Sequence, residues 1–218
     1  DKDDIARELC LSDVADELRV TLMKCYYNDL KKLQQKLTFT DLQDFINELR
    51  ANLYTAMFNP NKHVGYNDII GPLNKIREIL IDKYHQLYLS DLDHFIDKVK
   101  IFRTHFATLD VRQDHSIHIQ VITAVLKQNG IIKSDLSELN DSELIDILLH
   151  KDLKLVADAY EEDIVKDTIK NIGQLKAIQQ KNGEEGCNRY IISNSEDVYS
   201  VLFVYGLFKW CGWKSDAI

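Results

Sequence analysis

The sequence is poor in the residues that interrupt helices. Its 218 residues include only two prolines and eight glycines, and helix formers such as Leu, Lys, Glu and Gln dominate the first half. Because proline and glycine are the strongest breakers of a helix, their scarcity favours long helices joined by few turns.

Other shortages argue against whole classes of protein. The net charge is −8 and the basic residues are scattered, whereas nucleic-acid surfaces need clustered Lys and Arg. No apolar run approaches the roughly 20 residues of a membrane span, and the longest one, over residues 198–213, contains Gly206 and Lys209. The first residues, DKDDIARE, lack the basic and apolar regions of a signal peptide, and no Met starts the chain. We expect a cytoplasmic protein that binds neither nucleic acid nor membrane, cut or processed from a longer chain.

The cysteines and histidines show no metal-binding pattern. The four cysteines have no CxxC spacing, so we predict small buried side chains in a reducing cytoplasm. His105, His115 and His118 are spaced unlike any standard ligand set and are interpreted as core or surface histidines.

Apolar residues recur at helical spacing through most of the chain. Ser12 and Ser90 have the character of N-caps, Pro72 suits the first turn of a helix, and the turn Asn59-Pro60-Asn61 stops one. Ser193 with Glu196 matches a capping box. The predicted helices cover about residues 12–37, 40–58, 68–88, 90–102, 116–128, 141–150, 161–180 and 195–211.

Two short segments are instead typical of strands, at about 105–111 and 189–192. In the first, Phe106, Leu109 and Val111 are apolar enough to bury, while Asp110 and Arg112 share one face at strand period. A charged pair on a buried strand is costly unless it is paired or bound to something. Arg112, at the C-terminal end of this strand, is therefore a candidate functional residue.

The segment LDVRQDHSIH, residues 109–118, resembles the D-[IV]-R-Q-[ED]-x-x-x-H segment of phosphoenolpyruvate carboxylases. The stretch RYIISNSEDVYSVLFVYGLFKWCGW, near the end of the chain, resembles that family's Y-[VI]-I-S segment and the helix after it. Residues 1–100 carry helical pattern without a motif. The resemblance implies a mainly α fold whose long packed helices and two short strands belong to a helix-rich (β/α)₈ barrel.

The resemblance also implies a domain organisation and a function. Residues 1–218 would form a single internal fragment, with 1–103 a helical lead-in and 104–218 strand–helix units of the barrel. The full-length enzyme would convert phosphoenolpyruvate and bicarbonate to oxaloacetate and phosphate, in anaplerotic carbon fixation. Arg112 would bind the substrate phosphate, since a guanidinium pairs bidentately with phosphate. Asp110 and Gln113 would orient it from a second layer of contacts.

The sequence departs from the family where many members have an arginine before the segment's histidine, because Ile117 stands there before His118. No match is found to the family's catalytic histidine, metal-binding carboxylates or glycine-rich loop. We therefore expect the isolated fragment to bind no metal and to lack carboxylation activity. The resemblance implies that the full-length enzyme uses Mg²⁺ or Mn²⁺ and is a homo-oligomer.

Purely structural interpretations stay open for several residues. Arg112 could be a structural arginine paired with Asp110 or Asp114, and the glycine-containing loop 182–186 is best explained as an ordinary surface loop. The aromatic residues of 199–213 are most simply helix packing. A non-catalytic helical scaffold or interaction protein that shares the pattern is the alternative function.

Overall fold

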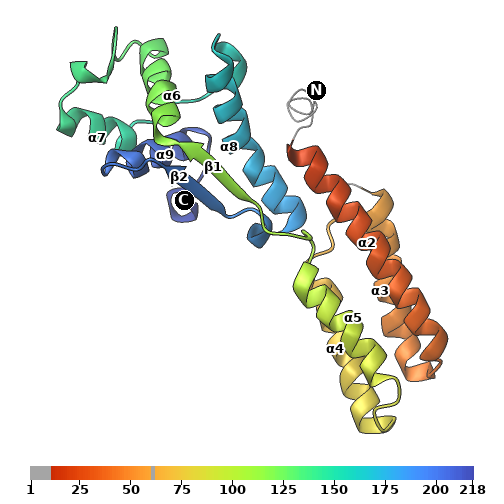
Figure 1. Ribbon diagram of the computed structural model, residues 1–218. Helices are drawn as coiled ribbons and strands as arrows, with labels where there is room; N and C mark the ends of the chain where they lie inside the picture. Colours follow the sequence, from red (N-terminus) through yellow and green to blue (C-terminus); the bar gives the residue numbers. More distant parts are fainter. Residues whose placement is uncertain (1–10, 60–61) are drawn as a thin grey trace. The chain divides into compact units, whose positions relative to one another are not determined.

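Most of the described chain is helical. The computed structural model describes residues 11–59 and 62–218, which form eight α-helices, short 3₁₀ turns and two strands (Figure 1). The predicted mainly α fold is confirmed. The chain divides into two compact units. Unit 1 runs up to Leu109 and includes Ile178–Cys187, and unit 2 comprises Asp110–Ala177 and Asn188–Ile218.

Unit 1 is built on four long helices. They are α2 (Leu11–Lys36), α3 (Thr40–Phe58), α4 (Tyr66–Lys83) and α5 (Leu89–Phe102). Helix α2 packs against α3 and α5, and α4 packs against the same two helices, so the four form a bundle (Figure 1). Each helix turns an apolar stripe inward, and the fully buried side chains include Tyr26, Leu30, Leu42, Ile46, Leu73, Ile76 and Leu80.

The predicted start of α3 at Thr40 is confirmed, but the starts of the other three helices of unit 1 differ from the predicted ones. Ser12 lies inside α2 and Ser90 inside α5, whose N-cap is Tyr88 with a left-handed φ of 59°. Helix α4 begins at Tyr66, so Pro72 lies in its interior rather than in its first turn. Proline there removes one backbone donor and its ring crowds the carbonyl four residues earlier, yet the helix continues to Lys83.

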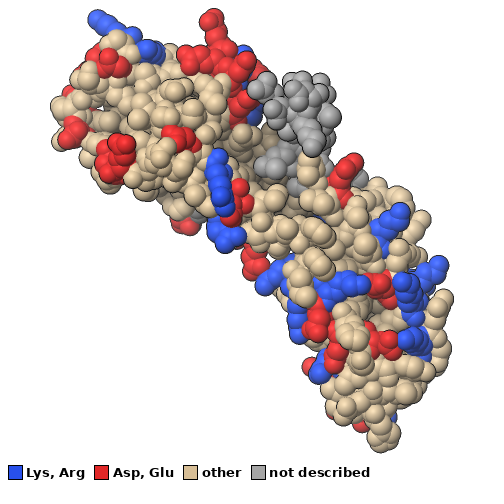
Figure 2. Space-filling view, viewed as in Figure 1, with Lys and Arg blue, Asp and Glu red and all other residues tan. Residues whose placement is uncertain are grey.

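Charges of both signs are interspersed over the bundle surface (Figure 2). Several pair across neighbouring helices: Lys36 with Asp91 at 2.7 Å, Arg77 with Asp93 at 2.7 Å, and Lys83 with Asp41 at 3.1 Å. These pairs are exposed and stabilise the fold little. The lysines of these pairs lie on solvent-exposed faces of their helices, as the scattered distribution of basic residues in the sequence indicated.

The segment after α5 is a turn and not the predicted strand 105–111. Arg103 and Phe106 have left-handed φ values of 47° and 68°, and the Phe106 ring stacks on Phe102. The Thr104 hydroxyl donates to the Asn182 carbonyl at 2.7 Å, which holds the turn within unit 1. The apolar side chains predicted to be buried are not, because Phe106 and Ala107 are exposed and Leu109 is only partly buried.

Unit 2 alternates two strands with helices. In chain order it contains β1 (Asp110–Asp114), α6 (His115–Gln128), α7 (Asp141–His150), α8 (Asp163–Asn182), β2 (Arg189–Ser193) and α9 (Tyr199–Trp210). The 3₁₀ turns of the chain are Leu136–Glu138, Ala157–Ala159, Glu184–Gly186 and Ser215–Ala217. The last residues of α8, from Ile178, and the 3₁₀ turn Glu184–Gly186 belong to unit 1. The predicted helix 141–150 is confirmed.

Helix α9 forms the apolar centre of unit 2, where it packs against α6 and α7. Phe203, Phe208 and Trp210 are buried, so the predicted packing role of the aromatic cluster is confirmed for these three. The predicted start of this helix at 195 is wrong: it begins at Tyr199, whose backbone N–H donates to the Asp197 carboxylate at 2.9 Å.

The cysteines were predicted to be buried, and this holds only in part. Cys187 is buried and Cys211 is half-buried, but Cys25 is exposed. Cys10 lies outside the described residues. Within 11–59 and 62–218, every helix is too short or too polar to cross a membrane.

Candidate functional site

The two strands of unit 2 form a parallel pair whose register fixes which side chains share a face. Strands β1 and β2 lie side by side (Figure 1). Asp110 pairs with Arg189, Arg112 with Ile191 and Asp114 with Ser193. Because side chains alternate along a strand, these six residues lie on one face, which we call the open face. Arg112, Arg189, Ile191 and Ser193 are exposed there. The other face carries Val111, Gln113, Tyr190 and Ile192, all partly buried.

Two arginines flank one carboxylate on the open face. Arg189 Nε lies 2.8 Å from Asp110 Oδ1, and Arg112 Nη2 lies 3.7 Å from Asp110 Oδ2. Oδ1 is buried and accepts no aligned hydrogen bond from the described residues, so its contact with Arg189 is an ion pair without hydrogen-bond geometry. The Arg112 side chain is 73% exposed, so most of its guanidinium faces solvent.

Arg112 lies in the middle of its strand and not at the C-terminal end, because β1 begins only at Asp110. The strand is also half-buried rather than buried, since one of its faces is open. Asp110 contacts Arg112, as the structural interpretation of Arg112 requires. Gln113 points to the opposite face by strand alternation, and its Oε1 accepts the backbone N–H of Asp114 at 2.9 Å. The binding role of Arg112 and the orienting roles of Asp110 and Gln113 stay predictions.

Polar side chains gather where the two strands end. Asp114 is the N-cap of α6 and accepts the Ser116 backbone N–H at 2.9 Å. Its other oxygen accepts from the Ser193 hydroxyl at 3.2 Å and the Asn194 amide at 2.5 Å. The donors, led by those of Ser116, hold the pKa of Asp114 below its ordinary value. Asp114 is thus an ionised link between the ends of β1 and β2.

The face of the strand pair opposite the open face contacts a buried histidine. His118 of α6 is fully buried, and its Nε2 lies 2.9 Å from the hydroxyl of Tyr190 on β2. Burial, and then the nearby His115, lower the pKa of His118 to about 4. Burial raises the pKa of Tyr190 to about 12, so both groups are neutral near pH 7.

No metal site is evident in the part of the chain that the structure describes. Within 11–59 and 62–218, no three His, Cys, Asp or Glu side chains converge to hold an ion. His115 and His118 are buried side chains of α6, in keeping with their interpretation as core residues.

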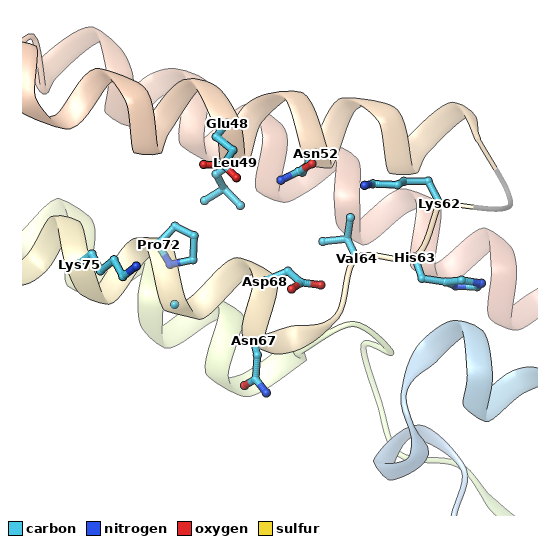
Figure 3. Close-up of a pocket in the computed structure, with 11 residues that line it drawn as sticks. Glu48, Leu49, Asn52, Lys62, His63, Val64, Asn67, Asp68, Pro72 and Lys75 are labelled. Carbon is cyan, nitrogen blue, oxygen red and sulfur yellow. The ribbon is translucent and has the colours of Figure 1, made fainter.

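Unit 1 contains a polar pocket of about 410 Å³ between α3 and α4 (Figure 3). Two of its charged side chains already make contacts within unit 1. The Asp68 carboxylate accepts the Gly65 backbone N–H at 2.9 Å, and Lys75 lies over the Phe45 ring. With Glu48 and Lys62 also on its wall, the pocket is mixed in charge and does not select a class of ligand.

The sequence did not single out Arg189 or Asn194 as members of this site, and it indicated Asp114 only as a possible partner of Arg112. Arg189 joins it only through the parallel register, because Asp110 and Arg189 are 79 positions apart yet directly opposed. The single signal in the sequence was the strand-like alternation of Arg189 to Ile192, which places Arg189 on the exposed face of its strand.

Comparison with known proteins connects the parallel strands and the arginine segment to one class of enzyme. The family model for phosphoenolpyruvate carboxylase matches residues 7–218. A phosphoenolpyruvate carboxylase of Thermosynechococcus vestitus is 28% identical over 130 residues, which is 58% of this chain and 13% of that protein. One from Gloeobacter violaceus is 28% identical over 151 residues, or 67% of this chain and 16% of that protein. One from Paraburkholderia xenovorans is 29% identical over 118 residues, or 52% and 12%.

The chain belongs to the phosphoenolpyruvate carboxylase family, as the arginine segment had indicated. The matched segments cover only 12 to 16% of the length of these relatives.

Proposed function

We propose that this chain is part of a phosphoenolpyruvate carboxylase and that Arg112 binds the phosphate of phosphoenolpyruvate. The complete enzyme would join bicarbonate to phosphoenolpyruvate and release oxaloacetate and phosphate. The supporting observation is the exposed guanidinium of Arg112 on the open face of a parallel strand pair, 3.7 Å from its nearest counter-charge. The N–H groups of such an exposed guanidinium can donate to a phosphate, which arginine binds in a bidentate way.

The position of the open face also supports the proposal. In (β/α)₈ barrels the active site lies at the C-terminal ends of the strands. Arg112 precedes the end of β1 by two residues and shares its face with Asp114 and Ser193, which mark the ends of both strands. We infer that the two strands belong to such a barrel in the complete protein, with the open face toward its centre.

Metal chemistry is proposed only for the complete protein. Mg²⁺ or Mn²⁺ would supply a positive charge that stabilises an enolate. The described residues offer no converging ligand set, so they do not fit a resident metal. By the same reasoning, the chain by itself would lack carboxylation activity.

The test is steady-state kinetics of the complete protein carrying Arg112→Lys. We expect KM for phosphoenolpyruvate to rise at least about tenfold, because Lys keeps the charge but loses the two parallel hydrogen bonds. Arg77→Lys is the matched control, since Arg77 pairs with Asp93 in unit 1 and its replacement should leave KM unchanged. An unaltered KM in Arg112→Lys would remove the phosphate-binding role, and absence of oxaloacetate formation by the unmodified protein would favour the scaffold alternative.

A further inference from the structure

Asp110 is shared unequally between two arginines. Its nearer contact is with Arg189 at 2.8 Å, whereas Arg112 lies 3.7 Å away on the other carboxylate oxygen. The Asp110 side chain is 24% exposed, while Arg112 and Arg189 are 73% and 60% exposed. The carboxylate is therefore the least hydrated of the three charges, and Arg189 is its closest counter-charge.

A carboxylate beside a phosphate-binding arginine has two opposing effects. It holds the guanidinium in place, but like a phosphate it offers two anionic oxygens that accept from a guanidinium, and so it competes for the same donors. Its charge repels the incoming anion, and at about 4 Å this repulsion is appreciable even with water around. A second cation on the carboxylate relieves both the competition and the repulsion.

We propose that Arg189 is a positioning residue that neutralises Asp110 and so leaves the guanidinium of Arg112 available to an anion. This inference rests on the proposed phosphate-binding role of Arg112 and adds a residue to it. The three side chains carry a net charge of +1 with Arg189 present and of zero without it. Arg189 reaches Asp110 because the parallel register places the two residues directly opposite each other.

The experiment measures binding of phosphoenolpyruvate, and of inorganic phosphate as a simpler probe, by isothermal titration calorimetry on the complete protein. Arg189→Gln should weaken binding about fivefold, the effect of one unit charge a few ångströms away in a hydrated site. Asp110→Asn in the same protein should restore affinity to within about twofold, because it removes the carboxylate that Arg189 had neutralised. Arg189→Lys keeps the charge and should stay close to the unmodified protein.

The rescue by Asp110→Asn separates this role from the others open to Arg189. If Arg189 contacted the substrate directly, the double variant would stay as weak as Arg189→Gln. If Arg189 were only structural, Arg189→Lys and Arg189→Gln would change the melting temperature and leave affinity unaltered. Either result overturns the inference, as does an Arg189→Gln variant of normal affinity. The fivefold difference should also shrink as salt rises from 50 to about 500 mM, since exposed charges are screened.

Failure of this inference is distinguishable from failure of the proposed function. Arg112→Lys reports on phosphate binding alone, whatever happens at Arg189. Weak binding by Arg112→Lys together with normal binding by Arg189→Gln would keep the proposed function and remove only the role of Arg189. Normal binding by Arg112→Lys would remove both.

Discussion

The buried His118 should make unit 2 sensitive to mild acid. Its side chain is fully buried beside Tyr190, and its pKa is lowered to about 4 from an ordinary 6.5. In the unfolded chain the imidazole takes up a proton near pH 6.5, whereas in the folded chain it stays neutral down to about pH 4. Because the unfolded state binds the extra proton, the free energy of unfolding falls as pH falls through this window.

The size of the loss follows from the two pKa values, 6.5 and about 4. Each pKa unit corresponds to about 1.4 kcal/mol. Protonation of the unfolded state therefore lowers the free energy of unfolding by about 2 kcal/mol at pH 5 and about 3 kcal/mol at pH 4. Such a loss is a large part of the 5 to 15 kcal/mol that stabilises an ordinary domain, as an order of magnitude.

The assay is urea unfolding at pH 7 and pH 5, followed by tryptophan fluorescence. The chain has two tryptophans, Trp210 and Trp213, and both lie in unit 2, so the signal reports on that unit alone. The comparison is with His118→Gln, which is neutral at both pH values. We expect the drop in unfolding free energy between pH 7 and pH 5 to be smaller in the variant by about 2 kcal/mol.

Comparing the pH-dependent drop, and not the stability itself, separates this effect from the loss of packing that the substitution causes at every pH. Direct titration of His118 by NMR in the unmodified protein provides a second measurement if the variant unfolds. A His118 resonance that titrates near pH 6.5, or an equal acid sensitivity in His118→Gln, would contradict the reasoning. Tyr190, whose hydroxyl lies 2.9 Å from His118, and the charge-bearing neighbours Asp114 and His115 are all retained in the comparison.

Most helices could be predicted from the sequence, because the apolar spacing that defines them is local. The helix at Asp141–His150 was predicted with its observed bounds, and in the structure Asn140 and Glu143 form a capping box at its start. A predicted cap was wrong where the side chain makes a tertiary contact instead. Ser193 was predicted to cap α9, but its hydroxyl donates to Asp114 on the neighbouring strand instead.

The first strand was misplaced for a related reason. Phe106 and Leu109 are as apolar as strand residues, yet Leu109 donates its backbone N–H to the Gly186 carbonyl at 2.8 Å and ends a turn. A strand exists only where a partner strand offers hydrogen bonds, and this chain places that partner 79 positions away. Composition near residue 106 cannot reveal such a partner.

The candidate site shows the same division between local and long-range information. Arg112 could be singled out because its surrounding segment carries a family pattern within a few residues. Arg189 could not, because its role depends on which residue of β1 it faces. A one-residue slip in register would move Arg189 away from Asp110 and opposite Val111. The register, and not the residue types, decides that a second guanidinium belongs to this face.

The remaining predictions concern stability in each unit. Asn140→Ala removes an N-cap whose side chain accepts the Glu143 backbone N–H at 3.0 Å, and should cost about 1 kcal/mol in urea unfolding. In unit 1, a Cβ added at Gly186 would lie 2.8 Å from the His105 Cβ, so the two segments must move apart. Gly186→Ala should therefore lower stability by about 1 to 3 kcal/mol, measured by thermal unfolding with far-ultraviolet circular dichroism. Gly71→Ala is the control, because a Cβ there meets no atom within 4 Å and alanine favours the α4 interior by about 0.5 to 1 kcal/mol. Stability changes of opposite sign in the two glycine variants would show that close approach, and not the loss of glycine, sets the cost. Equal changes would contradict the close packing of Gly186 on His105.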